Sequence, residues 1–406
     1  MNLAASVATG LDVLADDGFR RLKGRRIGLI ANPTTVDRRM RHLADLLRAA
    51  PGVELLALFG PEHGVLGDAQ DMIGVESEVD RRTGVPVHSL YGSTVESLSP
   101  TAESLTGLDL LIFDVQDVGS RYYTFAATMA YAMASAARQG LEFLVLDRPN
   151  PIGGTLVEGP TVAEGHESFV GFHPLPIRHG MTVGELALMV RSELGLDLEL
   201  AVVACEGWQR SMFWSDTGLS WVAPSPNMPT PDTALVYPGG CLIEGTNLSE
   251  GRGTTRPFEN WGAPWLDLER LETRTRELLK EAGVGEGVDL RPNPFRPTFH
   301  KHASRLCLGL QPHVQDRTMF RPVAVYAAFL AAAFEVGGES FAWRTEPYEF
   351  IENPIAIDLL FGSSRERLAI ETGLSGERLR NLVEDDWKRD ETEFLERRRP
   401  FLIYPQ

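Results

Sequence analysis

The sequence predicts an α/β protein: a Rossmann-like, doubly wound and mostly parallel sheet, followed by a second, smaller α+β domain. Three observations predict this fold. Short apolar or β-branched runs end in polar turns that contain Gly or Pro, helix-like segments separate these runs, and the composition changes after Trp221. Apolar runs of about six residues between helical patterns are typical of buried parallel strands.

The first part of the chain contains six such runs. We expect strands at residues 26–31, 53–59, 85–90, 108–113, 141–146 and 198–204. Residues 38–50, 123–139 and 183–194 have helical patterns. Strands that alternate with helices predict a parallel sheet with helices on both faces.

The second part begins at a proline-rich joint. Four prolines occur within residues 224–231, which indicates a break between domains. We therefore expect a Rossmann-like catalytic domain at residues 1–225 and a smaller domain at residues 230–406 that completes a cleft. The smaller domain has a Gly-rich polar segment at 239–253, helices at 266–282, 322–336 and 375–383, and a strand pattern around 305–310.

The charge balance excludes some partners. Lysine and arginine total 39 against 56 aspartate and glutamate residues, so the formal net charge is −17. An acidic surface repels phosphate backbones and anionic lipid heads, and we expect neither a nucleic-acid partner nor a membrane. The longest apolar run, residues 323–334, is shorter than the ~20 residues of a membrane span.

The three cysteines indicate a reducing compartment. Cys205, Cys241 and Cys307 are odd in number and lack the spacing of a disulfide framework or a zinc site. The N-terminus has no basic segment and carries Asp12 early, unlike a secretory signal. We therefore expect free thiols and a cytoplasmic location.

Candidate site residues follow the predicted strands, because ligands of open parallel sheets bind outside the carboxyl ends of the strands. Glu62 and His63 end the second strand in a turn stiffened by Pro61 and flanking glycines. Two titratable groups side by side suit acid and base catalysis. The alternative is that Glu62 caps a helix and His63 binds a backbone carbonyl.

A second group follows the strand at residues 108–113. It contains Asp114, Gln116, Asp117, Arg121 and Tyr122. Arg121 is expected near the N-terminus of a helix, where anions are favoured and a guanidinium can clamp a carboxylate. The alternative is that Asp117 caps that helix and Arg121 pairs with it.

A third group lies at residues 147–160. Prolines on both sides restrict Asn150, which could hold its amide ready for sugar hydroxyls, and Asp147 and Arg148 precede it. An Asx-turn at Asn150 is an equal alternative. His179 could line the same cleft, although a structural role is the more usual one for a lone histidine.

The densest group lies at residues 244–259. It contains Glu244, Asn247, Glu250, Arg252 and Thr254, and its glycines let the backbone approach a ligand. Neither helical nor strand periodicity accounts for these residues, which favours a binding loop over a solvated one.

Two further kinds of site lack support in the sequence. No G-x-G-x-x-G follows the first predicted strand, and no G-x-x-x-x-G-K-[ST] occurs, so we expect no nucleotide cofactor. His300 and His302 have no Cys or Asp at metal-ligand spacing, so we expect no metal.

Nine segments together resemble one known family. They are GPEHG (60–64), SLYG (89–92), FDVQDVGSRYYT (113–124), LDRPNPIGG (146–154), VEGP (157–160), RHGMTVGEL (178–186), PSPNMP (224–229, with Asn227), YPGGCLIEGTNLSEGRGTTRPFENWGAPW (237–265) and FRPTFHKHAS (295–304). In this order they resemble the YbbC-like, NamZ-type exo-β-N-acetylmuramidases, glycoside hydrolase family 171.

The resemblance implies an enzyme of cell-wall turnover. Such an enzyme removes β-linked N-acetylmuramic acid from the non-reducing ends of peptidoglycan fragments, with its active site between two domains, and Glu62 matches the family's catalytic position. Glycoside cleavage needs an acid and a second group at the anomeric centre, for which Asp117, Glu244 and Glu250 are candidates. Arg121, Arg148, Arg252 and Arg256 could bind the anionic sugar.

Three alternatives remain open at this stage. A β-N-acetylhexosaminidase of other specificity would share the acid without needing the arginine. A two-lobed sugar-binding protein would capture the sugar without turnover. A nucleotide-binding Rossmann protein would be stabilised by NAD or ATP.

Overall fold

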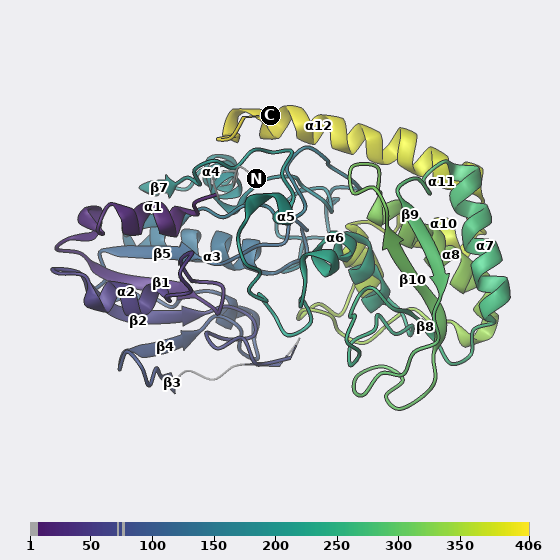
Figure 1. The fold of residues 1–406 in the computed structure, drawn as a ribbon, viewed down its shortest axis with the longest axis horizontal. Coiled ribbons are helices and arrows are strands. Elements are labelled where there is room, and N and C mark those ends of the chain that lie inside the picture. Colours follow the sequence, from purple (N-terminus) through teal and green to yellow (C-terminus); the bar gives the residue numbers. More distant parts are fainter. Residues whose placement is uncertain (1–6, 71–72, 75–77, 406) are drawn as a thin grey trace, which may run out of the picture.

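In the computed structural model, which describes residues 7–70, 73–74 and 78–405, the larger sheet has the strand order β3-β4-β2-β1-β5-β6-β7 (Figure 1). Six of its strands are parallel, and β3 (Glu78–Val79) is an antiparallel edge strand. The parallel strands are β1 (Arg26–Ala31), β2 (Glu54–Gly60), β4 (Pro86–Ser89), β5 (Leu110–Asp114), β6 (Glu142–Leu146) and β7 (Leu200–Val203).

The six predicted strands are confirmed, and the fold is the doubly wound α/β sheet. β3 was missed because two residues are too few to show a periodic pattern. The chain builds one side of the sheet with β1, β2 and β4 and the other with β5, β6 and β7. The strand order therefore reverses between β1 and β5, where such sheets usually bind ligands.

Helices cover both faces of this sheet. Leu14 of α1 (Gly10–Asp16) and Leu47 of α2 (Leu43–Ala49) share a buried cluster with Leu29 of β1. On the other face, Met129 of α3 (Phe125–Gln139) and Leu186 of α4 (Val183–Glu193) belong to a second cluster that contains residues of β1 and β5. Two separate cores on one sheet account for its almost wholly apolar strands.

The helix predicted at 38–50 begins five residues late, at Leu43. The Asp37 carboxylate accepts hydrogen bonds from the backbone N–H groups of Arg39 and Arg41, and Met40 has a left-handed φ of 60°. This Asx-type turn occupies the donors that a first helical turn would need, so residues 37–42 form a loop.

The second part carries the smaller antiparallel sheet, in the order β8-β10-β9. Its strands are β8 (Trp261–Ala263), β9 (Val288–Pro292) and β10 (Leu308–Val314). The helices of this part are α6 (Pro231–Gly240), α7 (Leu268–Ala282), α8 (Pro322–Gly337), α9 (Ala356–Phe361), α10 (Arg365–Glu371), α11 (Gly376–Asn381) and α12 (Lys388–Arg398), and a short α5 (Trp214–Thr217) precedes the joint. The helices expected at 266–282, 322–336 and 375–383 correspond to α7, α8 and α11.

The most apolar helix is part of the core. By length and composition Pro322–Ser340 is the one segment of the described residues that could cross a membrane, and most of it is buried inside the protein. In α8, Tyr326 and Phe329 contact the Trp261 ring at centroid distances of 4.3 and 4.5 Å. These contacts are those of a helix packed within a protein core.

The Gly-rich segment at 239–253 is only partly a loop. Its first residues end α6 and form a buried 3₁₀ turn at Cys241–Gly245, where the sequence suggested an irregular binding loop. A Cβ atom on Gly239 would lie 2.2 Å from the Pro322 carbonyl oxygen. This glycine therefore serves the close packing of α6 on α8 and not ligand binding.

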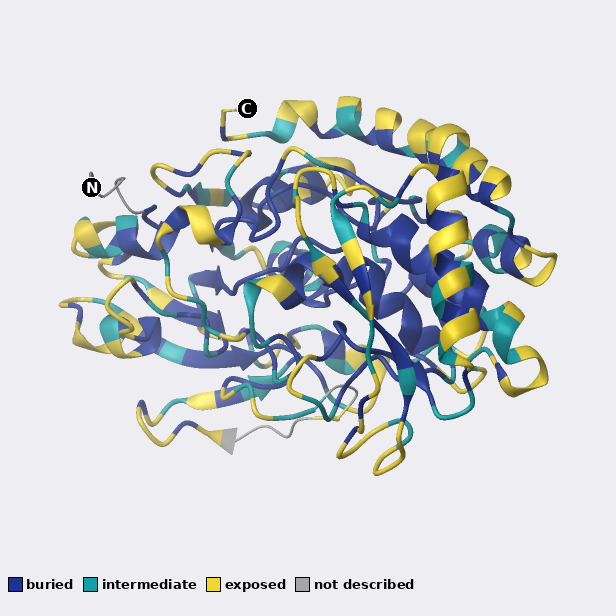
Figure 2. Ribbon diagram, turned by 45° about the vertical axis from the view of Figure 1, so that its right-hand side comes forward, coloured by how far each residue is buried: buried dark blue, intermediate teal, exposed yellow. Residues whose placement is uncertain are grey.

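The C-terminal segment returns to the first sheet. After α12, whose outward face is exposed and inward face buried (Figure 2), the Tyr404 hydroxyl donates to the Asp147 carboxylate at 2.5 Å. The Cys205 N–H donates to the same hydroxyl at 2.8 Å. One buried cluster also includes residues of both parts of the chain. The division into two domains, at residues 1–225 and 230–406, stays a prediction.

We predict that Tyr404→Phe lowers the free energy of unfolding by about 1–3 kcal/mol, because it leaves the fully buried Asp147 with one donor fewer. Urea denaturation followed by circular dichroism measures this change. Tyr131→Phe is the control, because the Tyr131 hydroxyl makes no hydrogen bond to the described residues. Equal stability of the two variants would contradict the anchoring role.

Candidate active site

Glu62 and His63 lie at the carboxyl end of β2, as predicted, and both are buried. The Thr124 hydroxyl donates to Glu62 Oε2 at 2.7 Å. His63 has a left-handed φ of 70°, and its Nδ1 lies 2.8 Å from the Ala69 carbonyl oxygen. The turn thus fixes His63 through the backbone and presents Glu62 to a cavity.

This cavity is built from both parts of the chain. Its volume is about 40 Å³, room for a few water molecules and too little for a hexose ring. The lining residues are Glu62, His63, Tyr122, Tyr123, Thr124, Val170, Ser225, Asn227, Met228, Tyr237, Glu244, Arg252, Phe258, Tyr348 and Glu349.

Aromatic rings form part of the cavity wall. Tyr237 contacts Tyr122, Tyr123 and Phe258 edge to face, with centroid distances of 5.7, 5.5 and 4.8 Å. The Arg252 guanidinium carbon lies 5.0 Å from the centroid of the Phe258 ring. Aromatic rings beside polar groups suit the apolar face and the hydroxyl groups of a sugar ring.

Two side chains of the cavity hold the Glu244 carboxylate. Arg252 Nη2 lies 2.6 Å from Glu244 Oε1, and the Tyr348 hydroxyl donates to Oε2 at 2.6 Å. Burial raises the pKa of Tyr348 well above its usual range, so this hydroxyl stays a donor. Glu62 accepts from the Thr124 hydroxyl. Two buried carboxylates that line one cavity can take the two roles that glycoside cleavage needs.

Glu250, a predicted catalytic candidate, lies outside the cavity lining. It is completely buried between His300 Nδ1 and Lys301 Nζ, each at 3.1 Å, and Arg252 Nε at 3.4 Å. Burial alone would raise the pKa of Glu250, but Lys301, His300 and Arg252 outweigh it and hold the pKa well below its usual value. Its position favours a structural role.

Asp117, another catalytic candidate, closes a turn. Its Oδ2 accepts the Gly119 N–H at 2.6 Å and lies 3.6 Å from His179 Nε2. Asp117 and His179 are both absent from the cavity lining. The His179 Nδ1 accepts the Met181 N–H, which is the ordinary structural role of a buried histidine.

Arg121 does not form the expected anion clamp. It is completely buried, and its guanidinium donates to the carbonyl oxygens of Pro160, Leu175 and Leu360. Arg256 pairs with Glu259 at 2.9 Å on the surface and likewise lies outside the cavity. Of the four arginines proposed from the sequence, Arg252 lines the cavity with Glu62.

The residues at 147–150 also serve the fold. Asp147 accepts from Tyr404, Thr182 and Gly184, and burial raises its pKa to about 6. Asn150 forms the Asx-turn that was the alternative, since its Oδ1 accepts the Ile152 N–H.

Two predicted site residues of the segment at 244–259 lie outside the cavity lining. The Asn247 side chain binds Ser340 and Ala342, and Thr254 lies in a groove outside the cavity.

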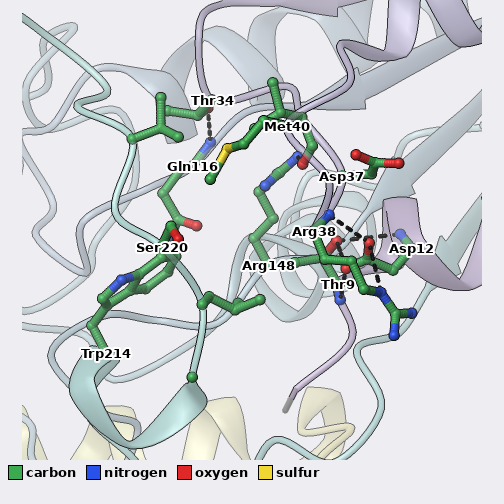
Figure 3. A pocket seen from close by; sticks show the side chains of 14 residues that line it. Thr9, Asp12, Thr34, Asp37, Arg38, Met40, Gln116, Arg148, Trp214 and Ser220 are labelled. Carbon is green, nitrogen blue, oxygen red and sulfur yellow. Dashed lines mark hydrogen bonds and ion pairs between the residues drawn. The ribbon is translucent and has the colours of Figure 1, made fainter.

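Gln116 and Arg148 line a different cavity, at the point where the strand order reverses (Figure 3). Its volume is about 230 Å³, and Thr34 binds the Gln116 N–H at its edge. Arg148 is paired there with Asp114 at 2.6 Å. Trp214 and Ser220 are among the other lining residues labelled in Figure 3.

This second cavity lacks a phosphate cradle. In the loop after β1, Pro33 has no N–H, and the N–H groups of Thr34 and Thr35 are bound to Asn32. The N–H groups of Val36 and Asp37 donate to the carbonyl oxygens of Thr34 and Arg41. Because the loop satisfies its own donors, it offers none to a pyrophosphate. A nucleotide-binding function loses support.

Two family models match the chain: the N-terminal part of the exo-β-N-acetylmuramidase NamZ over residues 27–232, and its C-terminal part over residues 235–404. The chain belongs to the NamZ family. The peptidoglycan β-N-acetylmuramidase NamZ of Bacillus subtilis is 45% identical over 398 residues, which are 98% of this chain and 91% of that protein.

Two solved structures have the same fold. Both are crystal structures of DUF1343 family proteins from Bacteroides fragilis, and both match 99% of this chain and 100% of their own. Their TM-scores are 0.86 at 34% identity and 0.76 at 30% identity. The resemblance to the NamZ family that the nine segments suggested is confirmed.

Several cavity residues of this NamZ-family chain were not singled out from the sequence. Tyr123, Thr124 and Tyr237 lie inside the matching segments and could have been found there. Tyr348 and Glu349 lie outside every segment, and no local pattern marks them. Glu349 accepts from the Tyr91 hydroxyl at 3.0 Å, a contact between residues 258 positions apart.

Metal ligation gives no further candidate. Within residues 7–70, 73–74 and 78–405, no three His, Cys, Asp or Glu side chains lie together where they could hold a metal ion. The absence of a metal cofactor stays a prediction.

We predict that Glu250→Gln lowers the free energy of unfolding by about 3 kcal/mol at pH 7, because it removes the anion that Lys301, Arg252 and His300 share. The pKa of Glu250 is lowered from its ordinary 4.5. Its contribution is therefore complete above pH 4.5 and is lost as the pH falls through the folded-state value. Urea denaturation at pH 7 and at pH 3.5 measures the free energies of unfolding of the variant and the unsubstituted protein. We expect the difference between them to be smaller at pH 3.5.

The control for this prediction is Glu272→Gln, which breaks an exposed pair with Arg276 that contributes about 0–1 kcal/mol. A difference between Glu250→Gln and the unsubstituted protein that stays constant or grows at low pH would contradict the assignment.

Proposed function

We propose that this chain is an exo-β-N-acetylmuramidase that releases N-acetylmuramic acid from the non-reducing ends of peptidoglycan fragments during cell-wall turnover and recycling. The observation that carries the proposal is the pair of buried carboxylates, Glu62 and Glu244, which come from the two parts of the chain and line one cavity. Membership of the NamZ family supports it.

Glu62 is proposed as the general acid. Its proton passes to the glycosidic oxygen as the bond to the anomeric carbon breaks, and the bonding electron pair leaves with that oxygen. The Thr124 hydroxyl fixes one oxygen of Glu62. Water then adds to the anomeric carbon, and its proton returns to Glu62.

Glu244 is proposed as the second group. Of the three candidates drawn from the sequence, it is the one that lines the cavity. A carboxylate held by Arg252 and Tyr348 can face the positive charge that develops at the anomeric carbon. It acts there either on the anomeric carbon itself or by orienting the substrate's own acetamido group.

Arg252 is proposed to recognise the lactyl carboxylate that distinguishes N-acetylmuramic acid from N-acetylglucosamine. A guanidinium has five N–H donors in a planar fork. Glu244 and Glu250 engage Nη2 and Nε, so the substrate carboxylate would share this cation with them. The specificity of the enzyme then depends on one residue of the dense loop.

Substrate binding requires the cavity to enlarge. Tyr348 and Glu349 lie on its wall, and Glu349 and Phe350 have left-handed φ angles of 47° and 68°. Their segment is therefore held in a strained conformation by Glu244 and Tyr91. Displacement of this segment would make room for the sugar and would withdraw one carboxylate from an anionic ligand.

The cytoplasmic location and the lack of a cofactor stay part of the proposal. The described structure supports free thiols, since Cys205, Cys241 and Cys307 are all buried and unlinked.

We predict that Glu62→Gln lowers kcat about 10²–10⁴-fold on the disaccharide of N-acetylmuramic acid and N-acetylglucosamine, whose leaving group needs a proton. The loss should be much smaller with a nitrophenyl muramide, whose leaving group departs as an anion. Glu259→Gln, outside the cavity, is the control. Unchanged turnover of the disaccharide by Glu62→Gln would refute the acid assignment, and no turnover by the unsubstituted protein would favour a binding protein.

We predict that Arg252→Lys lowers the preference for nitrophenyl muramide over nitrophenyl glucosaminide about 10–100-fold, because lysine keeps one charge but loses the planar fork. The ratio of the two kcat/KM values measures this preference. Arg256→Lys should leave the ratio unchanged, since Arg256 faces away from the cavity. An unaltered ratio in Arg252→Lys would show that another group selects the muramide.

A further inference from the structure

An outer groove adjoins the Glu62 cavity. Asn227 lines both, and Arg252 of the cavity is followed directly by Gly253 of the groove. The groove has a volume of about 650 Å³ and is lined by polar side chains and one exposed ring, among them Gln70, Asn227, Thr254, Asn260 and Phe299. It is much larger than the inner cavity and lies open to solvent.

Phe299 is exposed on a loop that is firmly held. The side chain is 41% exposed, although it follows Thr298, whose N–H and hydroxyl both donate to the Gly253 carbonyl at 2.9 and 2.8 Å. A Cβ atom on Gly253 would lie 2.7 Å from the Phe299 nitrogen. Only glycine lets these two loops meet so closely.

The residues after Phe299 are bound to the segment at residues 243–250, which contains the cavity residue Glu244 and lies close to Arg252 in the sequence. His300 and Lys301 bind Glu250, Lys301 Nζ also donates to the Ile243 carbonyl at 3.2 Å, and His302 Nε2 lies 2.7 Å from the Asn247 carbonyl. His300 and His302 both have left-handed φ angles, of 68° and 56°. These three consecutive side chains thus hold the loop to residues 243–250, while the aromatic ring before them lines the outer groove.

We propose that this groove is the subsite for the sugar on the leaving-group side of the scissile bond, and that Phe299 is the platform on which that sugar stacks. The proposal rests on the proposed function, since it names where the rest of the same substrate lies. An exposed aromatic ring on a rigid loop binds the apolar face of a pyranose at little entropic cost. Thr254, Asn260 and Gln70 supply hydrogen-bonding groups beside it.

The groove also explains why the sequence segments at 237–265 and 295–304 belong together. The inner cavity uses Tyr237, Glu244, Arg252 and Phe258 of the first segment and none of the second. The groove is lined by Gly253, Thr254, Thr255 and Asn260 of the first segment and by Phe295, Arg296, Thr298 and Phe299 of the second. On this assignment the first segment contacts both sugars of the substrate: the N-acetylmuramic acid in the cavity and the leaving-group sugar in the groove.

The test compares two substrates that differ in the leaving group. The disaccharide of N-acetylmuramic acid and N-acetylglucosamine places a sugar in the groove, whereas β-muramyl fluoride places no ring there. We expect Phe299→Ala to lower the ratio of kcat/KM for the disaccharide to kcat/KM for the fluoride about tenfold. Phe299→Trp should restore the ratio, because it restores a stacking surface.

Leu306→Ala is the matched control, since Leu306 is 48% exposed near the end of the same loop but does not line the groove. An unchanged ratio in Phe299→Ala, or the same fall in Leu306→Ala, would overturn the subsite. Failure of the unsubstituted protein to cleave either substrate would instead overturn the proposed function, so the two failures are distinguishable.

Discussion

The site depends on the neutralisation of one buried carboxylate, Glu250. A charge without solvent is very unfavourable unless opposite charges and hydrogen bonds surround it. Here the compensating groups come from two segments: Arg252 from its own loop, and His300 and Lys301 from residues 295–304. Meeting this requirement fixes Arg252 next to Glu244 on one side and Phe299 at the groove on the other. A residue that lies outside both cavities therefore sets the geometry of each.

Buried arginines likewise satisfy buried polar groups in the irregular loops after the strands. Such loops leave many carbonyl groups without a partner in a sheet or helix, and these must be satisfied when buried. Arg121 binds three of them and Arg398 binds the His179 and Gly180 carbonyls. An arginine in a polar segment can therefore either bind a ligand or satisfy buried carbonyl groups of a loop. Only its contacts in the folded protein distinguish these two roles.

This distinction marks the limit of what the sequence could predict. The six parallel strands followed from local apolar runs bounded by turns, because burial on both faces leaves a continuous signal along the chain. Glu62, Glu244 and Arg252 were also found, since each stands in a polar segment. Asn150, Arg121 and Asp117 lie outside the cavity, and their side chains bind the backbone of distant or neighbouring loops. Tyr348 and Glu349 were missed because their role arises only from contacts with Glu244 and Tyr91.

The net charge of −17 makes the arrangement of the cavity a particular electrostatic problem. Glu62, Glu244 and Glu349 line it together with a single arginine, so the carboxylates of the cavity also oppose an anionic sugar. On the proposed mechanism Glu62 enters the reaction protonated, as a general acid must, which removes one of the three anions. Displacement of Glu349 with its strained segment removes a second. On the proposed mechanism the Glu244–Arg252 pair then remains beside the substrate, where the guanidinium attracts the lactyl carboxylate.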